Sequence, residues 1–150
     1  MIKYITKPLE QLSEDTIFNK LYYLTNHGAS TMRSLLDYYK INRVTKNFVA
    51  IIVKQNNKYI GWCLIEKESA NAFMMFYIKP EKREKGIGRN LINRAKRYAK
   101  NKGIKTIFVA PWNDTSKAFF TSMNFRKDAP THSLAAYAPA YSRFGWYINI

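Results

Sequence analysis

The sequence has little cysteine, little histidine and few acidic residues, and it lacks a long hydrophobic run. Cys63 is the only cysteine, so no disulfide can form within the chain. His27 and His132 are the only histidines, and with one cysteine they give no zinc-site spacing. No apolar run approaches the roughly 20 residues of a membrane span, and residues 1–8 lack the apolar stretch of a secretory signal. These absences predict a cytoplasmic protein with no metal site and no membrane partner.

The length of 150 residues is enough for one hydrophobic core, because a chain of this size buries roughly 68–70% of its unfolded surface. No internal repeat or low-complexity tract divides the sequence. We therefore expect a single domain over residues 1–150, as a monomer or a homodimer.

Positive charge is in large excess, since 25 lysines and arginines against 10 acidic residues give a net charge of +15. Much of the excess lies between residues 79 and 105, where only Glu81 and Glu84 are acidic. The basic residues of this segment are Lys79, Lys82, Arg83, Lys85, Arg89, Arg94, Lys96, Arg97, Lys100, Lys102 and Lys105. Four of them, Arg94, Lys96, Arg97 and Lys100, lie away from the apolar stripe of the helix, and they form either a solvated helix face or a surface that attracts RNA, DNA or an acidic protein. No nucleic-acid-binding motif accompanies them, so both interpretations stay open.

A glycine-containing segment, Arg83-Glu84-Lys85-Gly86-Ile87-Gly88, lies between a strand-like run and a helix-like run. A turn that enters a helix leaves several backbone N–H groups unpaired, with the positive end of the helix dipole behind them. Such a turn binds phosphate, and the charges of Arg83, Lys85 and Arg89 add to the amide dipoles. Its two glycines let the backbone approach a ligand without an intervening Cβ. The segment lacks the Lys-Ser/Thr ending of a Walker loop and one glycine of a dinucleotide fingerprint.

Hydrophobic periodicity predicts a βαβ unit around this segment. Residues 72–79 form a strand that Pro80 ends, a helix opens at Arg89 and closes at residues 101–103, and residues 105–110 form the next strand. Strands linked in this way are parallel neighbours joined by a right-handed crossover. The helix has apolar residues at Ile87, Leu91, Ala95 and Tyr98. We also expect strands at 48–53, 59–65 and 146–150, a helix at 114–123, two helical pieces between 9 and 39, and a loop at about 129–145.

A second block follows, with Asn113 at a strand end, a short helix, and the pair Asn124-Phe125. In this order and spacing the two blocks resemble the GNAT superfamily of acyl-coenzyme A dependent N-acyltransferases, over about residues 48–127. Asn124 stands where the family usually has glycine, and Asn is the next best residue for a left-handed helix end. The resemblance implies an α/β (α+β) fold: one mixed, mostly antiparallel sheet of six to seven strands with a parallel βαβ pair, flanked by helices. It also implies acetyl transfer from acetyl-CoA to a primary amine of a protein, an aminoacyl-RNA or a small molecule.

The resemblance further implies which residues bind the coenzyme. The parallel strands splay apart after Phe76, so the N–H groups of Tyr77 and Ile78 contact the pantetheine arm and polarise the thioester carbonyl. Asn113 hydrogen-bonds the pantetheine amides, or caps the following helix, or does both. The complete set of implied coenzyme-binding residues is Tyr77, Ile78, Arg83, Lys85, Gly86, Ile87, Gly88, Arg89, Asn113 and Ser116.

A general base matters most for a lysine acceptor, whose neutral form at pH 7 is disfavoured by roughly 4.6 kcal/mol. For an α-amine the deficit is only about one pH unit. In this family the general base, when present, is often a carboxylate that acts through water near the fourth strand. Residues 73–78, which form that strand here, contain no carboxylate. The nearest candidates are Glu66 and Glu68, each of which is either the base or an ordinary surface carboxylate. This shortage favours an acceptor amine of low pKa or a base that the acceptor itself carries.

Phe120 stands where many relatives have a tyrosine that protonates the departing thiolate. Phenylalanine cannot donate this proton, and a general acid typically contributes about 10²–10⁴ in rate. Another hydroxyl, such as that of Tyr141 or Ser116, replaces it, or turnover is slow, or the site binds coenzyme without transfer. Three hypotheses follow: an N-acetyltransferase, a nucleic-acid modifying or binding protein on the same scaffold, and a coenzyme-binding domain without catalysis.

Overall fold

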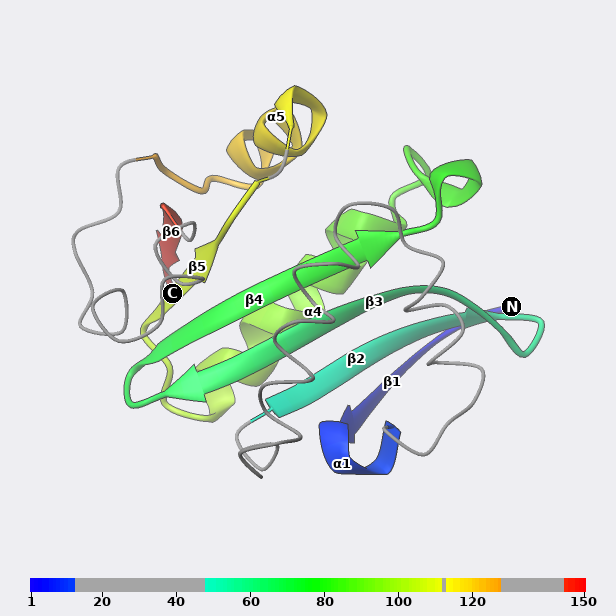
Figure 1. Ribbon diagram of the computed structural model, residues 1–150, viewed down its shortest axis with the longest axis horizontal. Coiled ribbons are helices and arrows are strands. Elements are labelled where there is room, and N and C mark those ends of the chain that lie inside the picture. The colour runs from blue at the N-terminus through cyan, green and yellow to red at the C-terminus, as the bar shows by residue number, and fades with distance from the viewer. Residues whose placement is uncertain (13–47, 112, 128–144) are drawn as a thin grey trace.

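The computed structural model describes residues 1–12, 48–111, 113–127 and 145–150, and its arrangement is shown in Figure 1. The strands are β1 (Ile2–Pro8), β2 (Phe48–Gln55), β3 (Lys58–Glu68), β4 (Asn71–Ile78), β5 (Thr106–Val109) and β6 (Trp146–Asn149). The helices are α1 (Leu9–Leu12), the 3-10 turn η2 (Pro80–Lys82), α4 (Ile87–Asn101) and α5 (Asp114–Ser122).

All six strands form one sheet in the order β1-β2-β3-β4-β5-β6. Every neighbouring pair is antiparallel except β4 and β5, which are parallel and joined by α4. The predicted mixed, mostly antiparallel sheet with one parallel βαβ pair and flanking helices is therefore confirmed. The strands predicted at 48–53, 59–65, 72–79, 105–110 and 146–150 and the helix predicted at 114–123 are each present within a few residues.

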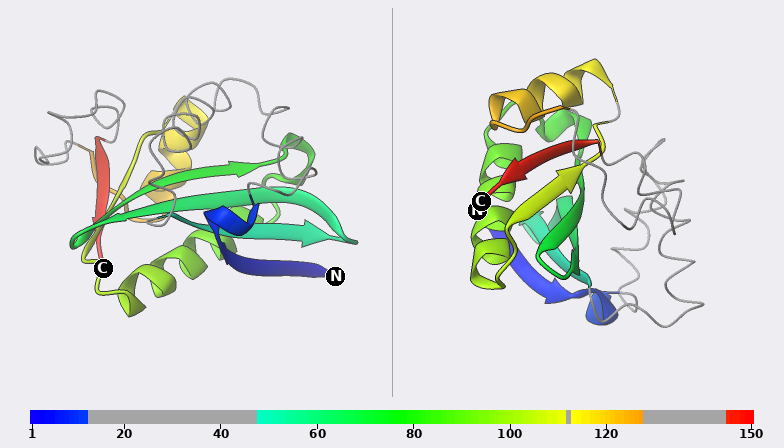
Figure 2. Two further views of the ribbon diagram at one scale, coloured as in Figure 1. Left: turned by 60° about the horizontal axis from the view of Figure 1, so that its bottom comes forward. Right: turned by 90° about the vertical axis from the view of Figure 1, so that its left-hand side faces the viewer.

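Helix α4 covers one face of the sheet, as the two views of Figure 2 show. Its buried side chains recur at helical spacing and pack against residues such as Ile51, Val53 and Ile65 of the sheet. The buried set is Ile87, Leu91, Ile92, Ala95 and Ala99 of α4, which differs from the predicted stripe by including Ile92 and Ala99.

Tyr98, which the periodicity placed on the apolar stripe of this helix, is only half-buried. Ala99 is fully buried and takes its place, because it lies on the side of α4 that faces the sheet. The helix begins at Ile87, two residues earlier than predicted, and ends where Lys102 and Gly103 follow it. Gly103 has φ +76°, the left-handed conformation that glycine adopts most easily at a helix end.

The edge strand β1 was not predicted from the sequence. Its burial pattern shows why, since only Tyr4 and Ile5 are half-buried and the other side chains of the strand are exposed. The strand is held by antiparallel pairing with β2, from Ile2 opposite Gln55 to Pro8 opposite Val49. Such pairing is set by a distant partner and leaves little trace in the local hydrophobic pattern.

The two helical pieces predicted between residues 9 and 39 lie outside the described residues, except for the turn α1. The loop predicted at about 129–145 lies outside them as well, apart from Gly145. Within the described ranges, no helix is long and apolar enough to cross a membrane. The same part of the chain holds no group of three or more His, Cys, Asp or Glu side chains that could bind a metal ion.

Candidate functional site

The loop between β4 and α4 leaves a row of backbone N–H groups unpaired. The first hydrogen bond of α4 runs from the N–H of Asn90 to the carbonyl oxygen of Gly86, at 3.1 Å. The preceding amides, those of Ile87, Gly88 and Arg89, therefore have no acceptor within the helix, and the N-cap residue Gly86 has no side chain to cap them. We call these three amides the amide rim. They satisfy the main requirement of an anion site at a helix N-terminus.

The charges around the amide rim also favour an anion. The first turn of α4 contains no acidic residue, although an acidic residue is the usual complement of the positive helix end. Lys85 and Arg89 are exposed beside the rim, and Glu84 is the acidic residue of the loop. Glu84 has φ +62° and Gly86 has φ +80°, so the loop holds two residues in the left-handed region. A non-glycine residue in this region is unfavourable by roughly 1–3 kcal/mol, and such strain is frequent where a loop binds a ligand.

The two glycines of the loop have different roles. Gly86 supplies the positive φ of the N-cap, and a Cβ placed there meets nothing within 4 Å. At Gly88 a Cβ lies 3.0 Å from Cζ of Phe76 and 3.3 Å from Cζ of Phe119. The sequence predicts that both glycines let the backbone approach a ligand. At Gly88 the structure adds a second requirement, room for two aromatic rings, one from β4 and one from α5.

Strands β4 and β5 separate before β4 ends. Their last parallel pair is Met74 with Val109, and β4 continues to Ile78. Figure 1 shows β5 diverging from β4 and running towards α5. The separation begins two residues earlier than the predicted position after Phe76. It leaves the second half of β4 with β3 as its only strand partner among the described residues.

Strand alternation identifies which amides of β4 face this opening. The N–H of Lys79 donates to Ile60 of β3 at 2.9 Å, so the amide of Tyr77, two residues earlier, also faces β3. The amides of Phe76 and Ile78 face the opposite way, towards the opening. We therefore replace Tyr77 by Phe76 as a candidate amide donor and retain Ile78.

Arg83 turns back towards the end of β4. Its Nε donates to the carbonyl oxygen of Ile78 at 2.8 Å, and its guanidinium lies 5.7 Å from the ring centre of Tyr77. Burial raises the pKa of the Tyr77 hydroxyl above its ordinary value, the charge of Arg83 lowers it, and Glu81 raises it. Arg83 thus fixes the strand end by a backbone contact, and its remaining guanidinium nitrogens stay near the loop.

Helix α5 begins at a side-chain cap. Oδ1 of Asn113 accepts a hydrogen bond from the backbone N–H of Ser116 at 2.9 Å, so Asn113 is the N-cap residue. This is the capping role that the sequence analysis named as an alternative to pantetheine binding. The helix ends at Ser122, and Asn124, two residues later, has φ +69° and so adopts the predicted left-handed conformation. Ser116 is half-buried in the first turn.

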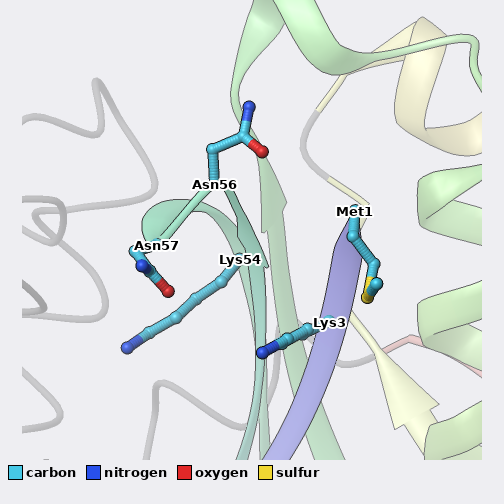
Figure 3. A pocket seen from close by; sticks show the side chains of 5 residues that line it. All are labelled: Met1, Lys3, Lys54, Asn56 and Asn57. Atoms are coloured by element: carbon cyan, nitrogen blue, oxygen red, sulfur yellow. The ribbon is translucent and has the colours of Figure 1, made fainter.

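Two surface hollows lie near the β2–β3 hairpin. One, of about 220 Å³, is lined by residues of β1 and of the hairpin, and Figure 3 shows Lys3 and Lys54 beside the turn formed by Asn56 and Asn57. A second, of about 410 Å³, is lined by Gln55, Asn56, Lys58, Ile60, Lys79, Glu81 and Lys82. Lysines line part of both hollows, and Glu81 is the acidic residue among the lining residues.

Comparison with known proteins agrees with this geometry. A sequence model described as "Acetyltransferase (GNAT) family" matches residues 15–125. The chain belongs to the GNAT acetyltransferase family. The match begins upstream of the region 48–127 on which the resemblance in the sequence rested. A search of curated protein sequences gives no match.

Solved GNAT structures share the fold at low sequence identity. The PaiA N-acetyltransferase from Thermoplasma acidophilum, in complex with coenzyme A, is 17% identical with a TM-score of 0.61, over 89% of this chain and 94% of that one. The ribosomal-protein-S18-alanine N-acetyltransferase from Escherichia coli is 14% identical with a TM-score of 0.63, over 86% and 80%. The IAA acetyltransferase from Bacillus cereus is 20% identical with a TM-score of 0.62, over 86% and 79%.

In this GNAT chain the Phe120 side chain belongs to the core. It is 5% exposed and makes edge contacts with Phe76, Phe119 and Phe125, at ring-centre distances of 5.9, 5.3 and 5.1 Å. Phe76 also stacks on Phe119 at 5.4 Å. The position where many GNAT proteins have a tyrosine hydroxyl is therefore apolar, and four rings fix its shape.

Glu66 lies on the sheet face opposite α4 and is only 6% exposed. The alternative of an ordinary surface carboxylate is therefore wrong for Glu66, whereas Glu68 at the end of β3 is half-buried. Glu66 pairs in register with Phe73 of β4, three residues before Phe76. At about 3.3 Å per residue, Glu66 is roughly 10 Å along the sheet from Phe76, whose amide faces the opening. A role for Glu66 as a base therefore requires one or more water molecules between it and the amine.

Trp62 lies on the same sheet face as Glu66. Its indole stacks on Tyr77 at 5.9 Å, and its Nε1 is buried without a hydrogen-bond partner. A buried unpaired donor is unfavourable by about 1–3 kcal/mol. Tyr141, the other catalytic candidate, lies outside the described residues.

Proposed function

We propose that this GNAT protein binds acetyl-CoA and transfers the acetyl group to a primary amine by direct attack in a ternary complex. The single observation that carries the proposal is the amide rim: three consecutive N–H groups at the start of α4, uncapped, with no acidic residue in the same turn. A diphosphate fits this requirement, because its oxygens accept several amide hydrogen bonds at once. The coenzyme A complex of the PaiA relative supports the choice of ligand.

Different groups of the chain would bind different parts of the coenzyme. The amide rim and the side chains of Lys85 and Arg89 hold the diphosphate. The N–H groups of Phe76 and Ile78, which face the gap between β4 and β5, donate to the pantetheine arm or to the thioester carbonyl. Asn113 keeps its cap, and Ser116 lies in the first turn of α5 on the other side of the gap.

The reaction requires a neutral amine and a leaving thiolate. Glu66 acts as base through water, or the acceptor is an α-amine that needs none, because its deficit of neutral form at pH 7 is about one unit. Phe120 cannot protonate the departing thiolate. Either the thiolate leaves unassisted, which a thiol pKa near 8.5 permits, or the hydroxyl of Tyr141 or Ser116 supplies the proton. The acceptor classes of the proposal are a protein amine, an aminoacyl-RNA and a small amine.

A thermal shift with acetyl-CoA, followed by thiol release in the presence of amine pools, tests the proposal. At 100 times Kd the ligand adds about 2.7 kcal/mol, or roughly 5–10 °C for a domain of this size. Gly86→Glu places a carboxylate beside the amide rim and should abolish the shift. Gly103→Glu is the matched control, because Gly103 also has a positive φ and open space at its Cβ but lies at the other end of α4. Equal shifts in the two variants would contradict the proposed pose.

Glu66→Gln tests the base. A base acting through water gives a kcat fall of about 10²–10⁴ together with loss of the acidic limb of the pH profile. An unchanged profile assigns proton removal to solvent or to the acceptor itself.

The alternative of a coenzyme-binding domain without catalysis rests on Phe120. It predicts the thermal shift with no thiol release from any amine pool. The alternative of a nucleic-acid-binding scaffold predicts retention on RNA and no shift with acetyl-CoA.

A further inference from the structure

A row of cations runs along the solvent face of α4. Arg89, Lys96, Arg97 and Lys100 recur at helical spacing on the side opposite the buried Leu91 and Ala95. We call these four residues the α4 basic band. From its first to its last residue the band extends about 16 Å, at 1.5 Å per residue.

No acidic side chain of α4 compensates this band. The sequence contains no Asp or Glu between Glu84 and Asp114, and within the described ranges none of the four cations has a carboxylate partner. Charge of one sign in this density exceeds what solubility requires of a small domain. The band is therefore a site of high positive potential.

Contacts with α5 hold two members of the band close together. Nη2 of Arg89 donates to Oγ of Ser122 at 3.5 Å, and Nζ of Lys96 donates to the carbonyl oxygen of Met123 at 3.3 Å. Partial burial lowers the pKa of Lys96, and the nearby charge of Arg89 lowers it further. The fold thus keeps two like charges near each other, an arrangement that a bound anion relieves.

The positive surface continues beyond the band. Nζ of Lys96 also lies 5.8 Å from the ring centre of Phe125, and the exposed Arg126 and Lys127 follow directly in the chain. The backbone of Arg126 exchanges hydrogen bonds with Tyr147, and Lys127 lies over the ring of Trp146 at 5.7 Å. Backbone pairing therefore positions Arg126, and a ring contact positions Lys127, while both side chains remain exposed to solvent.

We propose that the α4 basic band binds the phosphodiester backbone of a nucleic acid. A protein partner needs an apolar core to its interface, yet the only large hydrophobic side chains exposed in the described part of the chain are Met1 and Ile2. A nucleic acid needs no such core, because release of its counterions supplies the binding free energy to a row of cations. The α4 basic band would therefore recognise the charge of the backbone and not the base sequence.

Fluorescence anisotropy with a labelled single-stranded RNA of about 20 nucleotides, in 50–200 mM KCl, tests this inference. The test variant is Arg97→Glu/Lys100→Glu, since both side chains are exposed and neither belongs to the proposed coenzyme site. The matched control is Lys7→Glu/Lys67→Glu, two exposed lysines on β1 and β3 that give the same change in net charge. We expect the test variant to bind at least about tenfold more weakly, with a salt slope smaller by about 1.4, and the control to lose less than about threefold.

Arg89 belongs to both the α4 basic band and the proposed coenzyme site, so coenzyme A should weaken RNA binding only in part. Three results would overturn the inference: equal losses in the test and control variants, poly-glutamate binding as tightly as RNA, and complete displacement of the RNA by saturating coenzyme A. The last result places the RNA on the amide rim. Single-stranded DNA of the same sequence should bind about as tightly as RNA, and a large preference between them contradicts backbone recognition. Because the test variant leaves the amide rim intact, failure here leaves the proposed acetyl transfer untouched.

Discussion

Gly88 at the start of α4 lies so close to Phe76 on β4 that a Cβ added at residue 88 would be 3.0 Å from Cζ of the phenylalanine ring. This contact joins the amide rim to the strand whose amides face the β4–β5 opening. The two parts of the proposed coenzyme site are therefore positioned by one aromatic packing unit, which Phe119 and Phe120 of α5 complete.

Gly88→Ala should lower the free energy of unfolding by about 1–3 kcal/mol, because the new methyl group overpacks the rings of Phe76 and Phe119. Urea unfolding measures this. In a Phe76→Ala background the loss should shrink, since the nearest ring atom is gone. Asn93→Ala, at an exposed position of the same helix, should instead stabilise by a few tenths of a kcal/mol. Stabilisation by Gly88→Ala would mean that helix propensity outweighs the contact.

Asn113→Ala should destabilise the protein by about 1 kcal/mol, through loss of the hydrogen bond to the Ser116 amide. Asn113→Ser keeps an N-cap oxygen and should recover most of this stability. Comparing coenzyme affinity in the two variants separates the roles of the residue. If Asn113→Ser is stable but binds coenzyme more weakly, the side chain also contacts the ligand; equal affinity leaves it a cap alone.

Phe120→Tyr should raise kcat for acetyl transfer, by up to about 10²-fold, with little change in KM for acetyl-CoA, because it supplies the missing proton donor. The buried hydroxyl should also lower stability by about 1–3 kcal/mol if it finds no partner. Phe119→Tyr is the control, because the ring of Phe119 is half-buried and lies next to Phe120 on the same helix. Steady-state kinetics of thiol release decides, and a kcat that stays constant or falls shows that thiolate protonation is not limiting.

Arg89→Gln should raise the pKa of Lys96 towards its ordinary value without restoring it fully, because burial is the larger cause of the lowered pKa. In the wild-type protein the unfolded state binds more protons between the lowered pKa and the ordinary one, so stability rises with pH across that window. NMR titration of the lysine side chains measures the pKa. Arg94→Gln should leave it unchanged, since Arg94 lies over the ring of Tyr4 at 4.4 Å.

The parts of the site that the sequence predicted are those with local causes. Glycine and proline punctuation marked the loop before α4, and Asn124 marked the end of α5, because these conformations depend on one or two residues. The family blocks placed the parallel pair correctly for the same reason. A turn, a cap and a helix start are each determined by residues that are neighbours in the sequence.

The parts that the sequence did not predict depend on contacts between distant residues. Gly88 is needed because Phe76 and Phe119 approach it from two other elements. Glu66 is buried although it lies near a strand end, and the β4–β5 separation begins early because β5 is only four residues long. Which amides face the gap follows from the register with β3, which no local pattern fixes.

The central claim is that the amide rim holds the diphosphate of coenzyme A, and backbone amide NMR tests it most directly. Titration with coenzyme A should shift the N–H signals of Ile87, Gly88 and Arg89 most strongly, with smaller shifts at Phe76 and Ile78. Pantetheine, which has no diphosphate, should leave the first three signals in place. Saturable binding of coenzyme A with those three signals unmoved would contradict the account.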